Sequence, residues 1–150
     1  HLTLTFLGGV EASRLGDLTA SLREACTGFG ALRLRVGQIG FFPDARQPRV
    51  VWIRVRDERD QLQSLQRVVE AATTEFTHHA PEPTFTAHVT LGRCGPIARS
   101  QVNALVAVAT AMEDRVFGAW TADHLDVIRS LLLRAGSQHV TLTTVPLTHS

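Results

Sequence analysis

A short pattern of alternating residues occurs twice in this chain of 150 residues and limits its fold more than any other feature. Residues 1–8 read His-Leu-Thr-Leu-Thr-Phe-Leu-Gly, and residues 88–92 read His-Val-Thr-Leu-Gly. Strict alternation of polar and apolar residues is typical of a half-buried strand. Each copy is therefore predicted to be a strand with an imidazole and a hydroxyl on one face and two apolar side chains on the other.

A single copy would carry little functional information, because any half-solvated strand shows a polar outer face. The second copy, with the same Leu and Gly context, indicates a pair of matched half-sites. The two histidines lie 87 positions apart (88 − 1), and each motif precedes a predicted helix and further strands, which is a weak internal repeat. Imidazole titrates near neutral pH, so two histidines can serve as acid and base in one reaction.

The rest of the sequence predicts one domain of mixed strands and helices. Helical spacing of apolar residues predicts amphipathic helices over 11–29, 57–78 and 100–112. Strands are predicted over 31–37, 50–55, 86–92, 119–129 and 138–145, with a Gly/Pro-rich loop over 37–48. Neighbouring strands combined with long helices favour an α+β fold over a doubly wound parallel sheet. A chain of this length that is 44% hydrophobic can bury one core.

Longer segments of the chain also fall in a recognisable order. The second motif reads Phe85-x-x-His-Val-Thr-Leu-x-Arg93, and it follows Gly37-Gln-Ile-Gly-Phe-Phe-Pro43, Arg46 and Pro48-Arg-Val-Val-Trp52. With residues 120–127 and 140–147, these segments resemble the 2H phosphoesterase superfamily, and most closely its bacterial and archaeal RNA 2′,3′-cyclic phosphodiesterase branch, historically called 2′-5′ RNA ligase. The resemblance covers nearly the whole chain. It implies two similar lobes with antiparallel sheets flanked by helices, an approximate two-fold axis and a central cleft.

The start of the sequence departs from this family. A strand and a helix normally precede the first His-x-Thr motif there, whereas His1 opens the sequence here. We therefore expect residues 1–150 to form a single bilobal domain that is truncated at its N-terminus, and whose first strand has lost a neighbour.

The resemblance implies metal-independent hydrolysis of RNA 2′,3′-cyclic phosphate ends, and of nucleotide 2′,3′-cyclic phosphates, to 2′-phosphates. His1 would be the general acid toward the leaving 3′ oxygen, and His88 the general base toward water. Hydroxyl and guanidinium groups beside them would bind the phosphoryl oxygens. The further candidates for contact with the phosphate and the RNA are Thr3, Thr90, Arg93, Arg46 and Phe42.

The composition limits which partners and which kinds of site the chain can have. A formal charge of +1 does not by itself predict a nucleic-acid-binding protein, and all fifteen basic residues are Arg, so basic contacts to phosphate would use a planar guanidinium. Cys26 and Cys94 are too few for a disulfide scaffold, and no segment approaches the roughly 20 apolar residues that span a bilayer. We expect a cytoplasmic monomer without cofactor or metal.

Trp52, on a β-branched strand, is predicted to be a core residue.

Three alternatives remain open. The chain could hold RNA ends without cleaving them. It could be a 2H enzyme that acts on 2′-5′ linkages or on ADP-ribose cyclic phosphate, or that ligates RNA reversibly. It could build a zinc site from His1, His88 and another histidine, although no His-Glu-x-x-His spacing is present.

Overall fold

The structure, a computed structural model, describes residues 1–80, 84–133 and 136–147. Its elements confirm the α+β class, with strands and helices mixed along the chain. In order they are η1 (Ala12–Arg14), α1 (Leu15–Ala25), β1 (Leu32–Phe42), β2 (Val50–Asp57), α2 (Gln61–Thr73), η2 (Thr74–Phe76), β3 (His88–Arg93), α3 (Arg99–Ala111), β4 (Val116–Ala122), β5 (His124–Leu133) and β6 (Gly136–Pro146). None of the helices within these ranges is long and apolar enough to cross a membrane.

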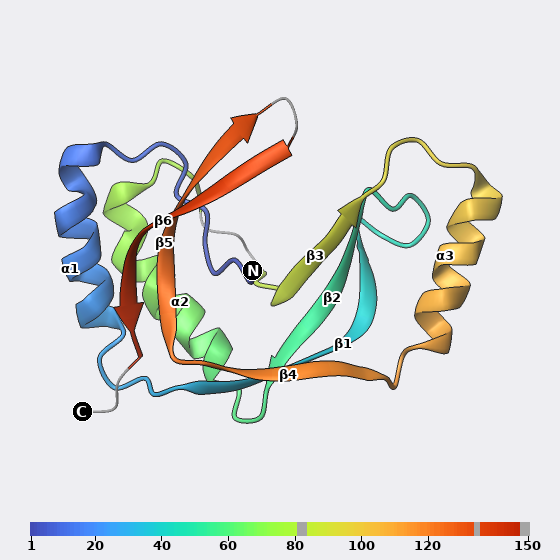
Figure 1. Ribbon diagram of the computed structural model, residues 1–150, viewed down its shortest axis with the longest axis horizontal. Helices are drawn as coiled ribbons and strands as arrows, with labels where there is room; N and C mark the ends of the chain where they lie inside the picture. The colour runs from blue at the N-terminus through green and yellow to red at the C-terminus, as the bar shows by residue number, and fades with distance from the viewer. Residues whose placement is uncertain (81–83, 134–135, 148–150) are drawn as a thin grey trace.

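The strands form two sheets that belong to two lobes. Four strands pair antiparallel in the order β3-β2-β1-β4, and β5 pairs antiparallel with β6. Only Asp123 separates β4 from β5, so the strand predicted over 119–129 is in fact two strands in different sheets. In Figure 1, α1 and α2 flank the β5–β6 lobe, and α3 stands at the opposite end of the molecule.

The largest apolar core lies in the lobe of α1 and α2. Helical spacing places Leu62, Leu65 and Val69 on one buried stripe of α2, as the sequence predicts. The carboxylate of Asp57 accepts a hydrogen bond of 2.6 Å from the Gln61 N–H and so satisfies a free donor at the start of α2. The other buried residues of this core are Leu18, Leu22, Cys26, Leu32, Leu34, Val55, Phe76, Val145 and Leu147. Burial raises the pKa of the Cys26 thiol.

The first motif does not form the predicted strand. Residues 1–11 pair with no strand in the described structure, and an extended segment without ladder hydrogen bonds is not a strand. The apolar side chains of Leu2, Leu4 and Leu7 nevertheless pack against the core, so the alternation predicted their burial correctly.

The second motif forms the predicted strand, β3, which lies at the edge of the four-stranded sheet. The loop predicted over 37–48 is shorter than expected, because β1 continues to Phe42. This continuation depends on a bulge: Gln38 has φ 59, and the pairing with β2 resumes at Ile39. The three predicted helices are present. α1 and α2 are shorter than predicted, and α3 has the predicted length but begins and ends one residue earlier.

Candidate active site

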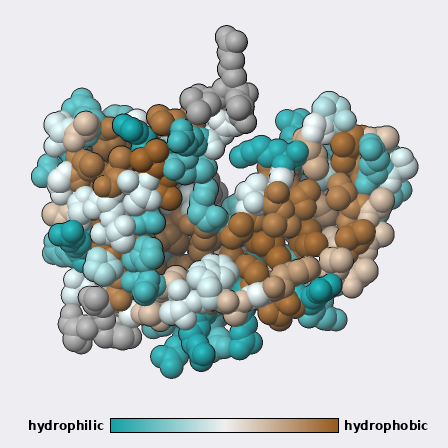
Figure 2. All heavy atoms as spheres, in the orientation of Figure 1, coloured by the Kyte–Doolittle hydropathy of each residue, from teal (hydrophilic) through white to brown (hydrophobic). Residues whose placement is uncertain are grey.

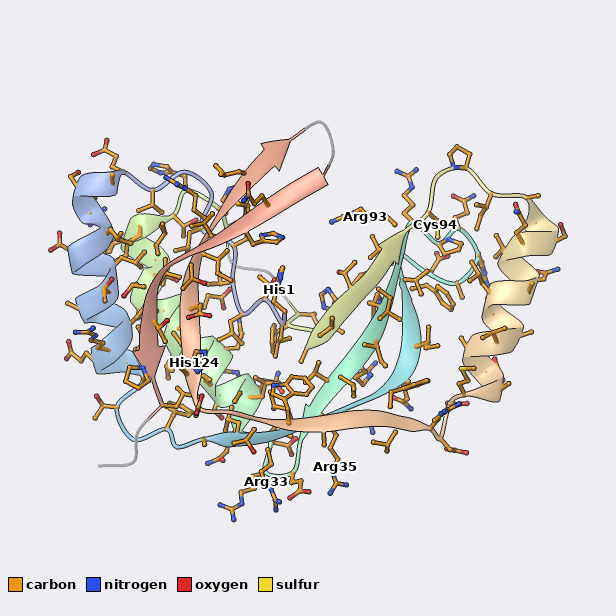
Figure 3. All side chains as sticks on the ribbon, viewed as in Figure 1. His1, Arg33, Arg35, Arg93, Cys94 and His124 are labelled. Atoms are coloured by element: carbon orange, nitrogen blue, oxygen red, sulfur yellow. The ribbon has the colours of Figure 1, made fainter. Side chains whose placement is uncertain are left out.

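The first motif lies at a large cavity that is bounded by the N-terminal segment and the β5–β6 pair and extends to apolar residues of α1, α2 and β1. The cavity has a volume of about 1030 Å³, and His1 and Thr3 line it together with Ser130 and His139. His1 is exposed, and Figure 3 shows it between the two lobes. Figure 2 shows the surface hollowed between the lobes, with hydrophobic residues on the side of the four-stranded sheet.

The cavity brings a third histidine to the site. The rings of His1 and His139 meet edge to face with centroids 4.7 Å apart. Ser130 faces His139 across the β5–β6 ladder, and its Oγ lies 3.2 Å from His139 Nδ1. His139 was not predicted as a site residue, because its closeness to His1 depends on how β6 pairs with β5.

His88, the first residue of β3, is half-buried and held from two sides. Its Nδ1 lies 2.7 Å from the carbonyl oxygen of Thr86. Because a carbonyl can only accept, Nδ1 carries the proton, and the neutral ring then has its lone pair on Nε2. The Phe42 ring contacts the His88 ring edge-on at 5.1 Å between centroids, and the Trp52 ring lies 5.8 Å away. The backbone and these rings therefore fix the orientation of the imidazole.

Trp52 is the centre of this aromatic group, and its burial confirms the prediction from sequence. Its side chain is only 7% exposed, and the Phe42 ring stacks on it at 5.0 Å between centroids. Gly40 pairs with Trp52 across the β1–β2 ladder. A Cβ atom at Gly40 would overlap the indole carbons, so the ring lies where only glycine leaves room for it.

Thr90 and Arg93 follow His88 along β3. Thr90 is exposed and pairs with Trp52, just as His88 pairs with Arg54, so Thr90 and His88 share a face of the sheet. A bulge after Thr90 shifts the register, and Arg93 then pairs with Val50 at the end of the strand. In Figure 3 the Arg93 side chain extends from the end of β3 into the space between the lobes.

Arg46 lies on the exposed loop between β1 and β2. Asp44 Oδ1 accepts hydrogen bonds from the backbone N–H groups of Arg46 and Gln47, at 2.7 and 3.1 Å. These N–H groups, that of Gln47 first, hold the pKa of the Asp44 carboxyl below its ordinary value. The turn therefore has a defined shape. It exposes Arg46, which is four residues after Phe42 in the sequence.

The structure gathers the expected residues into two groups. His1 and Thr3 belong to the cavity, whereas His88 and Phe42 belong to the aromatic group around Trp52. Val89 connects them, because it lines the same cavity as His1 while its neighbour His88 points to the other face of β3. Within the described ranges, no three His, Cys, Asp or Glu side chains are arranged to hold a metal ion.

Comparison with known proteins gives consistent results. The family model of the 2′-5′ RNA ligase superfamily matches residues 1–132. An RNA 2′,3′-cyclic phosphodiesterase of Aeropyrum pernix is 30% identical over 145 residues, which is 95% of this chain and 78% of that protein. An RNA 2′,3′-cyclic phosphodiesterase of Aquifex aeolicus is 27% identical over 137 residues, or 91% of this chain and 71% of that protein.

Solved structures agree with this result at the level of the fold. TT0787 of Thermus thermophilus superposes with a TM-score of 0.77 at 25% identity, over 99% of this chain and 78% of its own. LigT of E. coli, solved in complex with 3′-AMP, gives a TM-score of 0.73 at 20% identity, over 99% of this chain and 77% of its own. The two lobes and their antiparallel sheets are thus the fold of the 2H phosphoesterases. By its sequence match and its architecture, the chain belongs to the 2′-5′ RNA ligase superfamily.

Proposed function

We propose that this chain hydrolyses RNA 2′,3′-cyclic phosphodiester ends, and nucleoside 2′,3′-cyclic phosphates, to 2′-phosphates. Membership of the superfamily and the activity named for its relatives support the reaction class. The observation that carries the mechanism is the hydrogen bond between His88 Nδ1 and the Thr86 carbonyl, which leaves Nε2 as the basic nitrogen of a neutral ring. An oriented imidazole of this kind suits a general base.

In the proposed reaction, His88 Nε2 takes a proton from a water molecule as that water attacks phosphorus. The bond from phosphorus to the 3′ oxygen breaks, and protonated His1 gives its proton to this leaving oxygen. Attack in line with the leaving group requires the acid and the base on opposite sides of phosphorus. In this proposal His1 and His88, which come from distant segments of the chain, would face the phosphate from opposite sides.

Hydroxyl and guanidinium groups stabilise the charge in this proposal. Thr3 and Thr90 donate hydrogen bonds to the non-bridging oxygens, and Arg93 binds phosphate through its planar fork. Phe42 and Arg46 contact the nucleotide, since an aromatic ring can stack on any base. No step requires a metal ion, because these donors and a protonated imidazole balance the charge.

The product identifies the reaction. Incubated with adenosine 2′,3′-cyclic phosphate and an excess of EDTA, the protein should release adenosine 2′-phosphate, which anion-exchange chromatography separates from the 3′ isomer. A 3′-phosphate product would reverse the roles of the two histidines. The proposed function would be contradicted if the protein turned over neither this nucleotide nor an oligonucleotide with a cyclic phosphate end. Parallel assays with 2′-5′-linked oligonucleotides and ADP-ribose cyclic phosphate test the alternatives.

Removal of one hydroxyl tests the oxygen contacts. The Thr90→Val variant keeps the shape of the side chain and should lower kcat/KM by about 10²-fold, since the loss of one such donor typically costs 10²–10³ in rate. Steady-state kinetics with the cyclic nucleotide measure the effect. Thr121→Val is the matched control, because Thr121 is an exposed threonine of β4 at the other edge of the same sheet. Equal rates for the two variants would contradict the role of Thr90.

A further inference from the structure

Arg54 lies next to the candidate base but has no role in the reaction described above. It pairs with His88 across the β2–β3 ladder, so the two Cα atoms are about 5 Å apart and the side chains share a face. Its guanidinium carbon lies 5.5 Å from the centroid of the Trp52 ring, which also contacts His88. Arg54 thus belongs to the same aromatic group as the imidazole.

The hydrogen bonds of Arg54 are incomplete. Its Nε is buried and has no acceptor among the described residues, and the Nε1 of Trp52 is likewise buried without a partner. The Arg54 residue as a whole is only partly buried. In the described residues no carboxylate pairs with Arg54, although Arg14 pairs with Glu75 and Arg35 with Glu58. Two residues along β2, Arg56 donates to the Gln38 side chain at 2.6 Å. Arg54 therefore differs from Arg35 and Arg56, whose guanidinium groups have partners in the described structure.

The incomplete hydrogen bonding of Arg54 lowers the stability of the folded state, and binding of an anion would explain why it is present. A buried N–H without an acceptor and a partly buried cation without a counter-charge both destabilise the folded state. The packing against Trp52 fixes the stem, so little side-chain entropy remains to be lost when an anion binds the terminal nitrogens. A guanidinium that is oriented but unpaired is suited to an oxyanion supplied from outside the protein.

We propose that Arg54 binds an oxygen of the substrate's reacting phosphate beside His88. The proposal deepens the proposed function and rests on it for the identity of the anion, a cyclic phosphodiester or the phosphate monoester formed from it. The proposal also gives Arg54 and Arg93 different positions relative to His88. Because of the bulge after Thr90, the span from His88 to Arg93 equals that of the four β2 residues from Arg54 to Val50, about 13 Å at roughly 3.3 Å per residue. Arg54 is therefore placed closer to the imidazole than Arg93, which would reach the same phosphate from the end of the strand.

Arg54→Met is the informative variant, because methionine retains an apolar stem against Trp52 and removes the guanidinium. Binding of adenosine 2′-phosphate, measured by isothermal titration calorimetry, should weaken about 10- to 100-fold, the usual effect of losing a hydrogen bond to a charged group. Binding of adenosine should not change. The melting temperature should stay equal or rise, since an unpaired buried donor has been removed. KM for adenosine 2′,3′-cyclic phosphate should rise, and Arg54→Lys should restore part of the loss. Arg56→Gln is the control on the same strand and face.

Several results would overturn the inference. These are unchanged binding of adenosine 2′-phosphate by Arg54→Met, an equal loss of adenosine binding, or no measurable binding of adenosine 2′-phosphate by the unaltered protein. The binding assay needs no turnover, so the two proposals can fail separately. Arg54-dependent binding without hydrolysis of any cyclic phosphate would contradict the proposed function and leave the Arg54 site standing. Hydrolysis that is unchanged in Arg54→Met would contradict the Arg54 site alone.

Discussion

The His88→Ala variant should hydrolyse adenosine 2′,3′-cyclic phosphate about 10²–10⁴-fold more slowly than the unaltered chain, the usual contribution of a positioned general base. The Nδ1 of His88 is engaged by the backbone carbonyl of Thr86, so that Nε2 remains to take the proton. Initial rates of 2′-phosphate formation in the presence of EDTA measure the loss.

His78→Ala is a suitable control for this experiment, because His78 is an exposed histidine beyond the end of α2. It should hydrolyse the cyclic nucleotide at the rate of the unaltered chain. Turnover by His88→Ala close to that rate would contradict the two-histidine mechanism, although the assignment of the fold would not change.

The Gly40→Ala variant should lose both stability and activity. A methyl group at this position overlaps the indole of Trp52, which is almost fully buried and cannot move without displacing the Phe42 and His88 rings. Forcing an extra methyl group into packed side chains typically costs about 1–3 kcal/mol. Urea denaturation measures the free energy of unfolding, and the cyclic nucleotide assay measures the displacement of His88.

Gly16→Ala is the matched control for this second experiment. No atom lies within 4 Å of a Cβ atom at Gly16, which is in α1, so alanine there should stabilise the helix by roughly 0.5–1 kcal/mol. The two glycine variants are therefore expected to shift the unfolding midpoint in opposite directions. A Gly40→Ala protein as stable and as active as the unaltered chain would show that Trp52 does not orient His88.

The sequence predicted those features that depend on local alternation. The second motif became β3, and the apolar stripe of α2 and the burial of Trp52 were also confirmed. Alternation at residues 1–8 predicted which side chains face the core, but not the absence of a strand. Burial follows from each side chain, whereas a strand also needs a hydrogen-bonded neighbour.

The parts that sequence reasoning missed depend on pairing between distant segments. Nothing local to Asp123 distinguishes one long strand from two strands in different sheets. The contact between His139 and His1, and the position of Arg54 opposite His88, follow from strand registers that only the folded chain defines. The paired motifs, together with the segments at 37–43, 48–52, 120–127 and 140–147 in the same order, were nevertheless enough for the resemblance to the family, which the family model over residues 1–132 confirms.

The path of β1 has a consequence for how the two lobes can move. Its first residues, Leu32 and Leu34, are buried in the core of α1 and α2, while the remainder of the strand runs through the other lobe to Phe42. Rotation of one lobe against the other would pull these leucines out of close-packed surroundings, which folded proteins resist strongly. The opening between the lobes should therefore keep a constant width when a ligand binds.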